Sequence, residues 1–199
     1  MDNISNLQMV DDFINTMPNK NMQAEAAASV YQDQLTKPSG SLGMLEELAV
    51  FLAGWQNSER PVIETAQAII FAGNHGICEQ GVNPYPQEVT QLMVSNFENG
   101  GAAMNQLCNL SGAELTVKPL SLDSPTQDFT QTKAMSMTEL LDAMSAGAKA
   151  VNRSANVILL GEMGIGNSTV SSALAASIFG GRVADWVGVG TGSRSEEHT

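Results

Sequence analysis

The stretch NVILLGEMGIGNSTVSSALAASIFG, residues 156–180, places the tightest limits on the fold. Its apolar start, 156–160, is typical of a buried strand, and the small residues after the glycines are typical of a helix. Gly161, Gly164 and Gly166 lie between the two, and Asn167 or Ser168 is suited to cap the helix. The sequence therefore predicts a strand that turns directly into a helix, through a loop with little side-chain bulk.

The segments before this stretch repeat the alternation of strand and helix. Strands are predicted over 64–73 and 113–120, and a helix from Gln87 is expected to be interrupted by NGG at 99–101, to resume and to end at Gly112. Ser136 and Glu139 form a capping box for a further helix that runs to about Arg153. This order predicts an α/β fold, a Rossmann-like parallel sheet with helices on both faces. Ligands are then expected at the carboxyl ends of the strands, in the loops after Gly73 and Leu160.

The N-terminal part differs in character. Helices are predicted over 22–34 and 42–55, separated by the loop TKPSGSLG. We therefore expect residues 1–60 to be the helical part of a small domain and residues 61–192 to be an α/β substrate-binding domain.

Composition excludes several classes of function. A chain of 199 residues with a net charge of −12 and nine Lys and Arg residues is a poor partner for nucleic acid. A bound anion would have to be held by backbone N–H groups. The sequence has neither an apolar run of about 20 residues nor a secretory signal, so a cytoplasmic protein without membrane contact is expected. The two cysteines, Cys78 and Cys108, are expected to be reduced thiols.

The motifs leave several chemical readings open. The spacing GxxGxG is neither the dinucleotide fingerprint nor Walker A, which disfavours a dehydrogenase or an ATPase; the loop either holds a phosphate or only turns the chain. The polar loop after Gly73 contains His75, which is either a general base, a metal ligand or a residue that orders the loop. The spacing of His75 and Cys78 is not evidence of a nucleophilic pair. The glycines of GVGTG, 188–192, are suited to an anion-binding nest.

Four motifs in this order, KPSGSLGMLEELA, GNHGICEQGVNPYPQEVTQLMVSNFENGGAAMNQL, GEMGIGNST and GVGTG, resemble the nicotinate-nucleotide:dimethylbenzimidazole phosphoribosyltransferase family of cobalamin biosynthesis over residues 36–192. The resemblance implies transfer of phosphoribose from nicotinate mononucleotide to 5,6-dimethylbenzimidazole, which gives α-ribazole 5′-phosphate and nicotinate. It also implies a homodimer and a reaction without a metal or organic cofactor.

The resemblance further implies roles for particular residues. The phosphoribosyl group would be held by the glycine loop, and Glu162 would contact the ribose. The loop spans Gly161 to Asn167, and the residues assigned to the site are Glu162, Met163, Gly164, Ile165, Gly166 and Asn167. Gln87 would contact the aromatic base beside a wall formed by Asn74, His75 and Gly76, and Thr191 and Gly192 would lie at the phosphate end.

The end of the chain departs from the family pattern. The family's general-base glutamate is expected beyond Thr199, so no catalytic residue is assigned within the chain. The segment SRSEEHT, 193–199, is expected to be foreign to the fold. Impaired transfer is therefore expected, and the alternative is a non-catalytic module that binds nicotinate mononucleotide or a benzimidazole.

Overall fold

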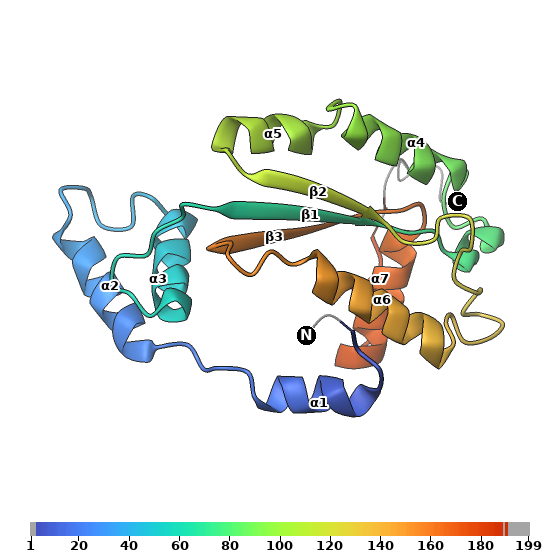
Figure 1. Ribbon diagram of the computed structural model, residues 1–199, viewed down its shortest axis with the longest axis horizontal. Coiled ribbons are helices and arrows are strands. Elements are labelled where there is room, and N and C mark those ends of the chain that lie inside the picture. Colours follow the sequence, from blue (N-terminus) through green and yellow to red (C-terminus); the bar gives the residue numbers. More distant parts are fainter. Residues whose placement is uncertain (1–2, 189, 191–199) are drawn as a thin grey trace. The chain divides into compact units, whose positions relative to one another are not determined.

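The computed structural model describes residues 3–188 and 190, which form a three-stranded sheet with helices and a separate group of helices (Figure 1). The helices and strands are α1 (Leu7–Asn15), α2 (Met22–Gln34), α3 (Met44–Gln56), β1 (Ala66–Ala72), η1 (Gly76–Gln80), α4 (Glu88–Glu98), α5 (Ala103–Ser111), β2 (Glu114–Pro119), α6 (Met137–Ala150), β3 (Val157–Met163), α7 (Asn167–Phe179) and η2 (Val183–Asp185). Two compact units result. The sheet unit contains residues 3–5, 66–153 and the described residues from 158 onward, and the helical unit contains residues 6–65 and 154–157.

The sheet has the strand order β2-β1-β3. β1 and β2 are parallel, in a register that places Gln67 opposite Glu114 and Ala72 opposite Pro119. The carboxyl ends of β1 and β3 are joined by a hydrogen bond of 3.0 Å, in which Gly73 N donates to Met163 O. β1 lies in the centre and is almost wholly buried, as its continuous apolar run predicts. The predicted parallel α/β fold is confirmed.

The strand order also determines where the helices and loops lie. The chain moves from β1 to β2 on one side and then crosses to β3 on the other side of β1. Because parallel crossovers are right-handed, the two connections pass over opposite faces of the sheet. Figure 1 shows α4 and α5 on one side of the strands and α6 and α7 on the other. The helices that follow β1 and β3 therefore lie on opposite faces of the sheet, and a crevice is expected where these two strands end.

Helix ends follow the local sequence with one exception. α5 ends before Gly112 at φ 73°, and the capping box of Ser136 and Glu139 opens α6, both as predicted. β3 runs three residues further than the predicted strand, to Met163. The predicted cap of α7 is wrong. The cap residue is Gly166 at φ 91°, with no side-chain hydrogen bond, because the Asn167 side chain is engaged elsewhere.

The helical unit contains the two predicted helices, α2 and α3, and one helix that was not predicted, α1. Asn6 caps α1 by accepting a hydrogen bond from Met9 N at 3.0 Å, a local signal that the sequence does contain. The loop between α2 and α3 is tied by Lys37, whose Nζ lies 2.7 Å from Glu46 Oε1. Among the described residues, no helix is long and apolar enough to cross a membrane.

Candidate functional site

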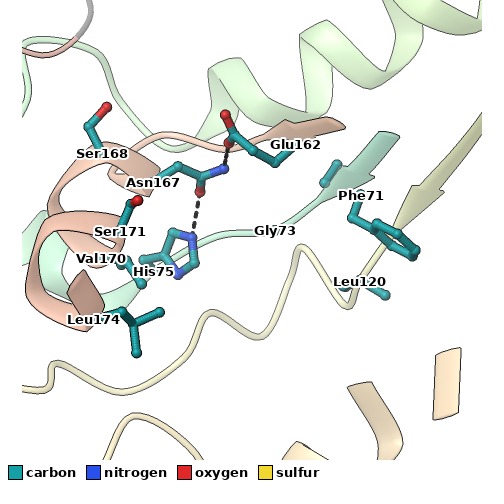
Figure 2. A pocket seen from close by; sticks show the side chains of 11 residues that line it. Phe71, Gly73, His75, Leu120, Glu162, Asn167, Ser168, Val170, Ser171 and Leu174 are labelled. Atoms are coloured by element: carbon teal, nitrogen blue, oxygen red, sulfur yellow. Dashed lines mark hydrogen bonds between the residues drawn. The ribbon is translucent and has the colours of Figure 1, made fainter. Parts of the chain in front are cut away.

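A pocket of about 460 Å³ lies at the carboxyl ends of β1 and β3, where the strand order predicts a ligand site (Figure 2). β1 and the residues after it contribute one wall, and the end of β3 and the first turns of α7 contribute the other. The lining residues are Phe71, Ala72, Gly73, His75, Leu120, Glu162, Asn167, Ser168, Val170, Ser171 and Leu174. The two loops singled out by sequence thus meet around one cavity.

Three polar side chains in this pocket form a continuous chain of hydrogen bonds (Figure 2). Asn167 Nδ2 donates to Glu162 Oε2, and His75 Nε2 lies 2.5 Å from Asn167 Oδ1. An ionised carboxylate only accepts hydrogen bonds, so the amide nitrogen of Asn167 must face Glu162 and its oxygen must face His75. His75 therefore donates from Nε2 to Asn167 Oδ1.

The glycines allow the two loops to approach each other. A Cβ atom on Gly164 would collide with the backbone oxygen of Gly73 and with the Asn167 side chain. A Cβ atom on Gly166 would lie 2.7 Å from Cys78 Sγ, and the φ of 91° at Gly166 also favours glycine. These glycines are therefore required by close packing.

Ile165 anchors the glycine loop to the rest of the sheet unit. Its N–H donates to Thr90 Oγ1 at 3.1 Å, and its carbonyl accepts from Cys78 Sγ at 3.2 Å. Thr90 is completely buried, and burial raises the pKa of the Cys78 thiol, which favours the protonated donor. Sequence reasoning missed Thr90; the only available signal is a hydroxyl within the apolar stripe of the helix after Gln87.

Two backbone N–H groups at the start of α7 remain available. Asn167 N donates to Gly164 O at 3.2 Å, whereas the N–H groups of Gly166 and Ser168 have no partner among the described residues. Free N–H groups at a helix N-terminus attract anions, because they carry the positive end of the helix dipole. This end of the pocket is therefore suited to a phosphate group, as the glycine motif suggests.

The loop after β1 is held by hydrogen bonds from its own side chains. Asn74 Nδ2 donates to Leu122 O at 3.1 Å, and Gln87 Nε2 donates to His75 O at 3.2 Å. A Cβ atom on Gly76 would lie 2.5 Å from the backbone of Asp128. The oxygens Asn74 Oδ1 and Gln87 Oε1 are buried without a hydrogen-bond donor in the described part of the chain. Both amides could thus accept a hydrogen bond from a ligand or from water.

A protein-family model described as a phosphoribosyltransferase matches residues 17–199. The chain belongs to this phosphoribosyltransferase family.

Curated relatives carry a more specific name. The chain is 59% identical over 177 residues to the nicotinate-nucleotide:dimethylbenzimidazole phosphoribosyltransferase of Rhodobacter capsulatus, in a match that covers 89% of this chain and 53% of that relative. It is 52% identical over 188 residues to the enzyme of the same name from Roseobacter denitrificans, with 94% and 56% covered. The chain spans about half the length of the curated relatives it matches.

Solved structures agree with the family assignment. The crystal structure of CobT from Thermus thermophilus superposes with a TM-score of 0.78 and is 34% identical in sequence. The match covers 88% of this chain and 58% of that chain. The α/β sheet of this chain thus has a counterpart in an experimental structure.

The residues predicted for the phosphoribosyltransferase site divide into three groups. His75, Glu162 and Asn167 line the pocket together. The remaining described candidates shape or anchor the two loops without lining it, and they are Asn74, Gly76, Gln87, Met163, Gly164, Ile165 and Gly166. Thr191, Gly192 and the segment 193–199 lie outside the described residues. Within the described part of the chain, no group of three or more His, Cys, Asp or Glu residues could hold a metal ion.

Proposed function

We propose that this chain provides the nucleotide-binding part of a nicotinate-nucleotide:dimethylbenzimidazole phosphoribosyltransferase. That enzyme transfers phosphoribose from nicotinate mononucleotide to 5,6-dimethylbenzimidazole and releases nicotinate. Its product, α-ribazole 5′-phosphate, is used to build the lower ligand of cobalamin. The observation that carries the proposal is the meeting of Glu162, Asn167 and His75 with the free N–H group of Ser168 in one pocket. The names of the relatives supply the reaction.

The chemistry of the pocket suits this substrate. The N–H groups of Gly166 and Ser168 would bind the phosphate, an arrangement that suits a chain of net charge −12 with nine basic residues. The exposed carboxylate of Glu162 would accept a hydrogen bond from a ribose hydroxyl. It would also stabilise the positive charge that develops at the anomeric carbon as the bond to nicotinate breaks.

The aromatic acceptor would occupy the side of the pocket next to the loop after β1. We propose that Gln87 contacts the benzimidazole and that Asn74, His75 and Gly76 shape the adjoining wall. The assignment is supported by the hydrogen bond from Gln87 Nε2 to His75 O, which holds Gln87 against the loop that contributes His75 to the pocket.

The reaction also requires a base. The azole nitrogen attacks the anomeric carbon and inverts it, the electron pair of the broken C–N bond goes to nicotinate, and the azole proton must be removed. Both titratable groups that line the pocket, Glu162 and His75, are hydrogen-bonded to Asn167. We therefore keep the proposal that the base is a glutamate outside these 199 residues.

A second candidate function is a binding module without turnover. It is favoured by one observation, namely that both titratable side chains lining the pocket, Glu162 and His75, are hydrogen-bonded to Asn167. Such a module would bind nicotinate mononucleotide or a benzimidazole but release no nicotinate. We also propose a cytoplasmic protein and a homodimeric full-length form, on the resemblance to the family. Light scattering of a full-length form would test the homodimer.

Calorimetry and an assay for nicotinate separate these possibilities. We expect the 199-residue chain to bind nicotinate mononucleotide and to show at most residual transfer to 5,6-dimethylbenzimidazole. A chimera that continues with the remaining part of the Rhodobacter capsulatus relative should release nicotinate faster by orders of magnitude. Equal rates for both proteins would place the base within this chain. A chimera that binds the nucleotide without releasing nicotinate would favour the binding module.

A further inference from the structure

Asn167 is the central member of the hydrogen-bond chain in the pocket, and it cannot be reversed. Its Nδ2 donates to Glu162 Oε2 and its Oδ1 lies 2.5 Å from His75 Nε2. A flipped amide would direct its oxygen at a carboxylate, which has no proton to donate. One asparagine therefore determines both the position of the carboxylate and the nitrogen from which His75 donates.

The backbone around Asn167 holds its side chain between Glu162 and His75. Asn167 is the first residue of α7, and its own N–H donates to Gly164 O at 3.2 Å. The absence of a side chain at Gly164 leaves room for Asn167 Oδ1. Helix-capping chemistry would use this side chain to accept backbone N–H groups, but Gly166 takes the cap position instead. The Asn167 amide is thus free to connect the two walls of the pocket.

The side chain of Glu162 depends on Asn167 for its position. It is the most exposed of the three side chains, and Asn167 is its only hydrogen-bond partner among the described residues. An exposed carboxylate without a partner samples several rotamers, and ordering it on ligand binding costs affinity. We infer that Asn167 is a positioning residue that holds Glu162 toward the nucleotide and fixes His75 as an Nε2–H donor. This inference rests on the proposed function, because it assigns Glu162 to the nucleotide.

The two bonds of Asn167 can be separated by substitution. Asn167→Ala removes both. Asn167→Asp keeps an oxygen that can accept from His75, but it offers no donor to Glu162 and adds a second negative charge beside it. Asn109→Ala is the matched control, because Asn109 is exposed on α5, away from the pocket lining. Circular dichroism melts of each variant establish that it is folded.

Nuclear magnetic resonance detects the hydrogen bond between His75 Nε2 and Asn167 Oδ1 directly. The chain has two histidines, His75 and His198, so an imidazole N–H signal is assigned by comparing His75→Gln with His198→Gln. A hydrogen bond slows exchange of this proton with water and makes it visible. We expect the signal in the unaltered chain, in Asn167→Asp and in the Asn109→Ala control, and its loss in Asn167→Ala. A signal that persists in Asn167→Ala would overturn the assignment.

Calorimetric titration with nicotinate mononucleotide measures how the hydrogen bond between Asn167 Nδ2 and Glu162 Oε2 affects affinity. Asn167→Ala and Asn167→Asp should each weaken binding by about tenfold or more, the size expected for a hydrogen bond to a charged group. In a Glu162→Ala background, Asn167→Ala should change the affinity by less than about twofold, because it acts through Glu162. Additive effects, or unchanged binding in Asn167→Ala, would refute only the positioning role. Absence of binding by the unaltered chain would refute the proposed function and this inference with it.

Discussion

Gly164 shows how one atom decides whether the two loops of the site can meet. It lies where the backbone of Gly73, after β1, and the side chain of Asn167, at the start of α7, come together. Its φ is not in the left-handed region, so the requirement for glycine is one of space and not of backbone conformation. Any side chain at this position would push the walls of the pocket apart.

Gly164→Ala should therefore destabilise the fold by about 1–3 kcal/mol, as expected for overpacking, and should weaken nucleotide binding. Gly147→Ala is the control, because a Cβ atom there meets nothing within 4 Å in the middle of α6. That variant should be more stable by about 0.5–1 kcal/mol, since alanine favours helix. Urea unfolding followed by circular dichroism measures both, and changes of the same sign would contradict the packing argument.

Thr90 is a second residue whose role depends on a single hydrogen bond. Thr90→Val keeps the volume but removes the acceptor of the Ile165 N–H in a fully buried position, so about 1–3 kcal/mol of stability should be lost. Thr90→Ser keeps the hydroxyl and should lose less. The free energy of unfolding in urea distinguishes the two variants. A larger loss for serine than for valine would show that the methyl group, and not the hydroxyl, matters.

At the scale of elements, short-range chemistry explains most of the helix boundaries. The loop between α2 and α3 is one example: Glu46 Oε1 accepts from Lys37 Nζ at 2.7 Å and from Leu42 N at 3.1 Å. The hydrogen bond from Lys37 and then that from Leu42 lower the pKa of Glu46 below its ordinary value of 4.5. The sequence predicts no more than a turn for the motif KPSGSLG. In the structure this loop is held by the two hydrogen bonds to Glu46.

The lowered pKa of Glu46 predicts a pH dependence of stability. The unfolded chain binds a proton at Glu46 more readily than the folded chain, so the stabilisation is present above pH 4.5 and is lost as pH falls through the folded pKa. Glu46→Gln should therefore melt at a lower temperature than the unaltered chain at neutral pH, and the difference should shrink as the pH falls below 4.5. Glu47→Gln removes the same charge at the exposed neighbouring residue and is the control. Thermal melts across this pH range provide the measurement.

At the scale of the whole chain, the sheet unit exposes apolar surface along β3 and α7. Leu160 of β3 is 74% exposed and Ile178 of α7 is 70% exposed. β3 is also an edge strand in the described sheet, and exposed apolar edges favour association with other chains.

Leu160→Lys should accordingly reduce the concentration-dependent self-association of the 199-residue chain, because a lysine on an edge strand opposes pairing. Asn109→Lys adds the same charge at an exposed position of α5 and should have a smaller effect. Sedimentation velocity over a range of concentrations measures the association. Equal effects of the two lysines would indicate that net charge alone governs it.

The sequence by itself determined most of the elements and their order, α1 excepted. The apolar run of β1, the capping box of Ser136 and the glycine at Gly112 act over a few residues, so they predict a strand, a helix start and a helix end without knowledge of the fold. The alternation of strands and helices then predicts a parallel sheet, and the resemblance of its loops to one enzyme family indicates which loops matter.

Only the tertiary structure decided how those loops are joined. Asn167 looked like a helix cap, but it connects Glu162 to His75, which is 92 residues away in sequence. Thr90 gave no functional signal, yet it holds Ile165 from 75 residues away. The physical reason is that capping and helical periodicity act between near neighbours, whereas the partner of a buried hydrogen-bonding group is set by which strands lie side by side. The strand order β2-β1-β3 brings the ends of β1 and β3 together and thereby forms the site.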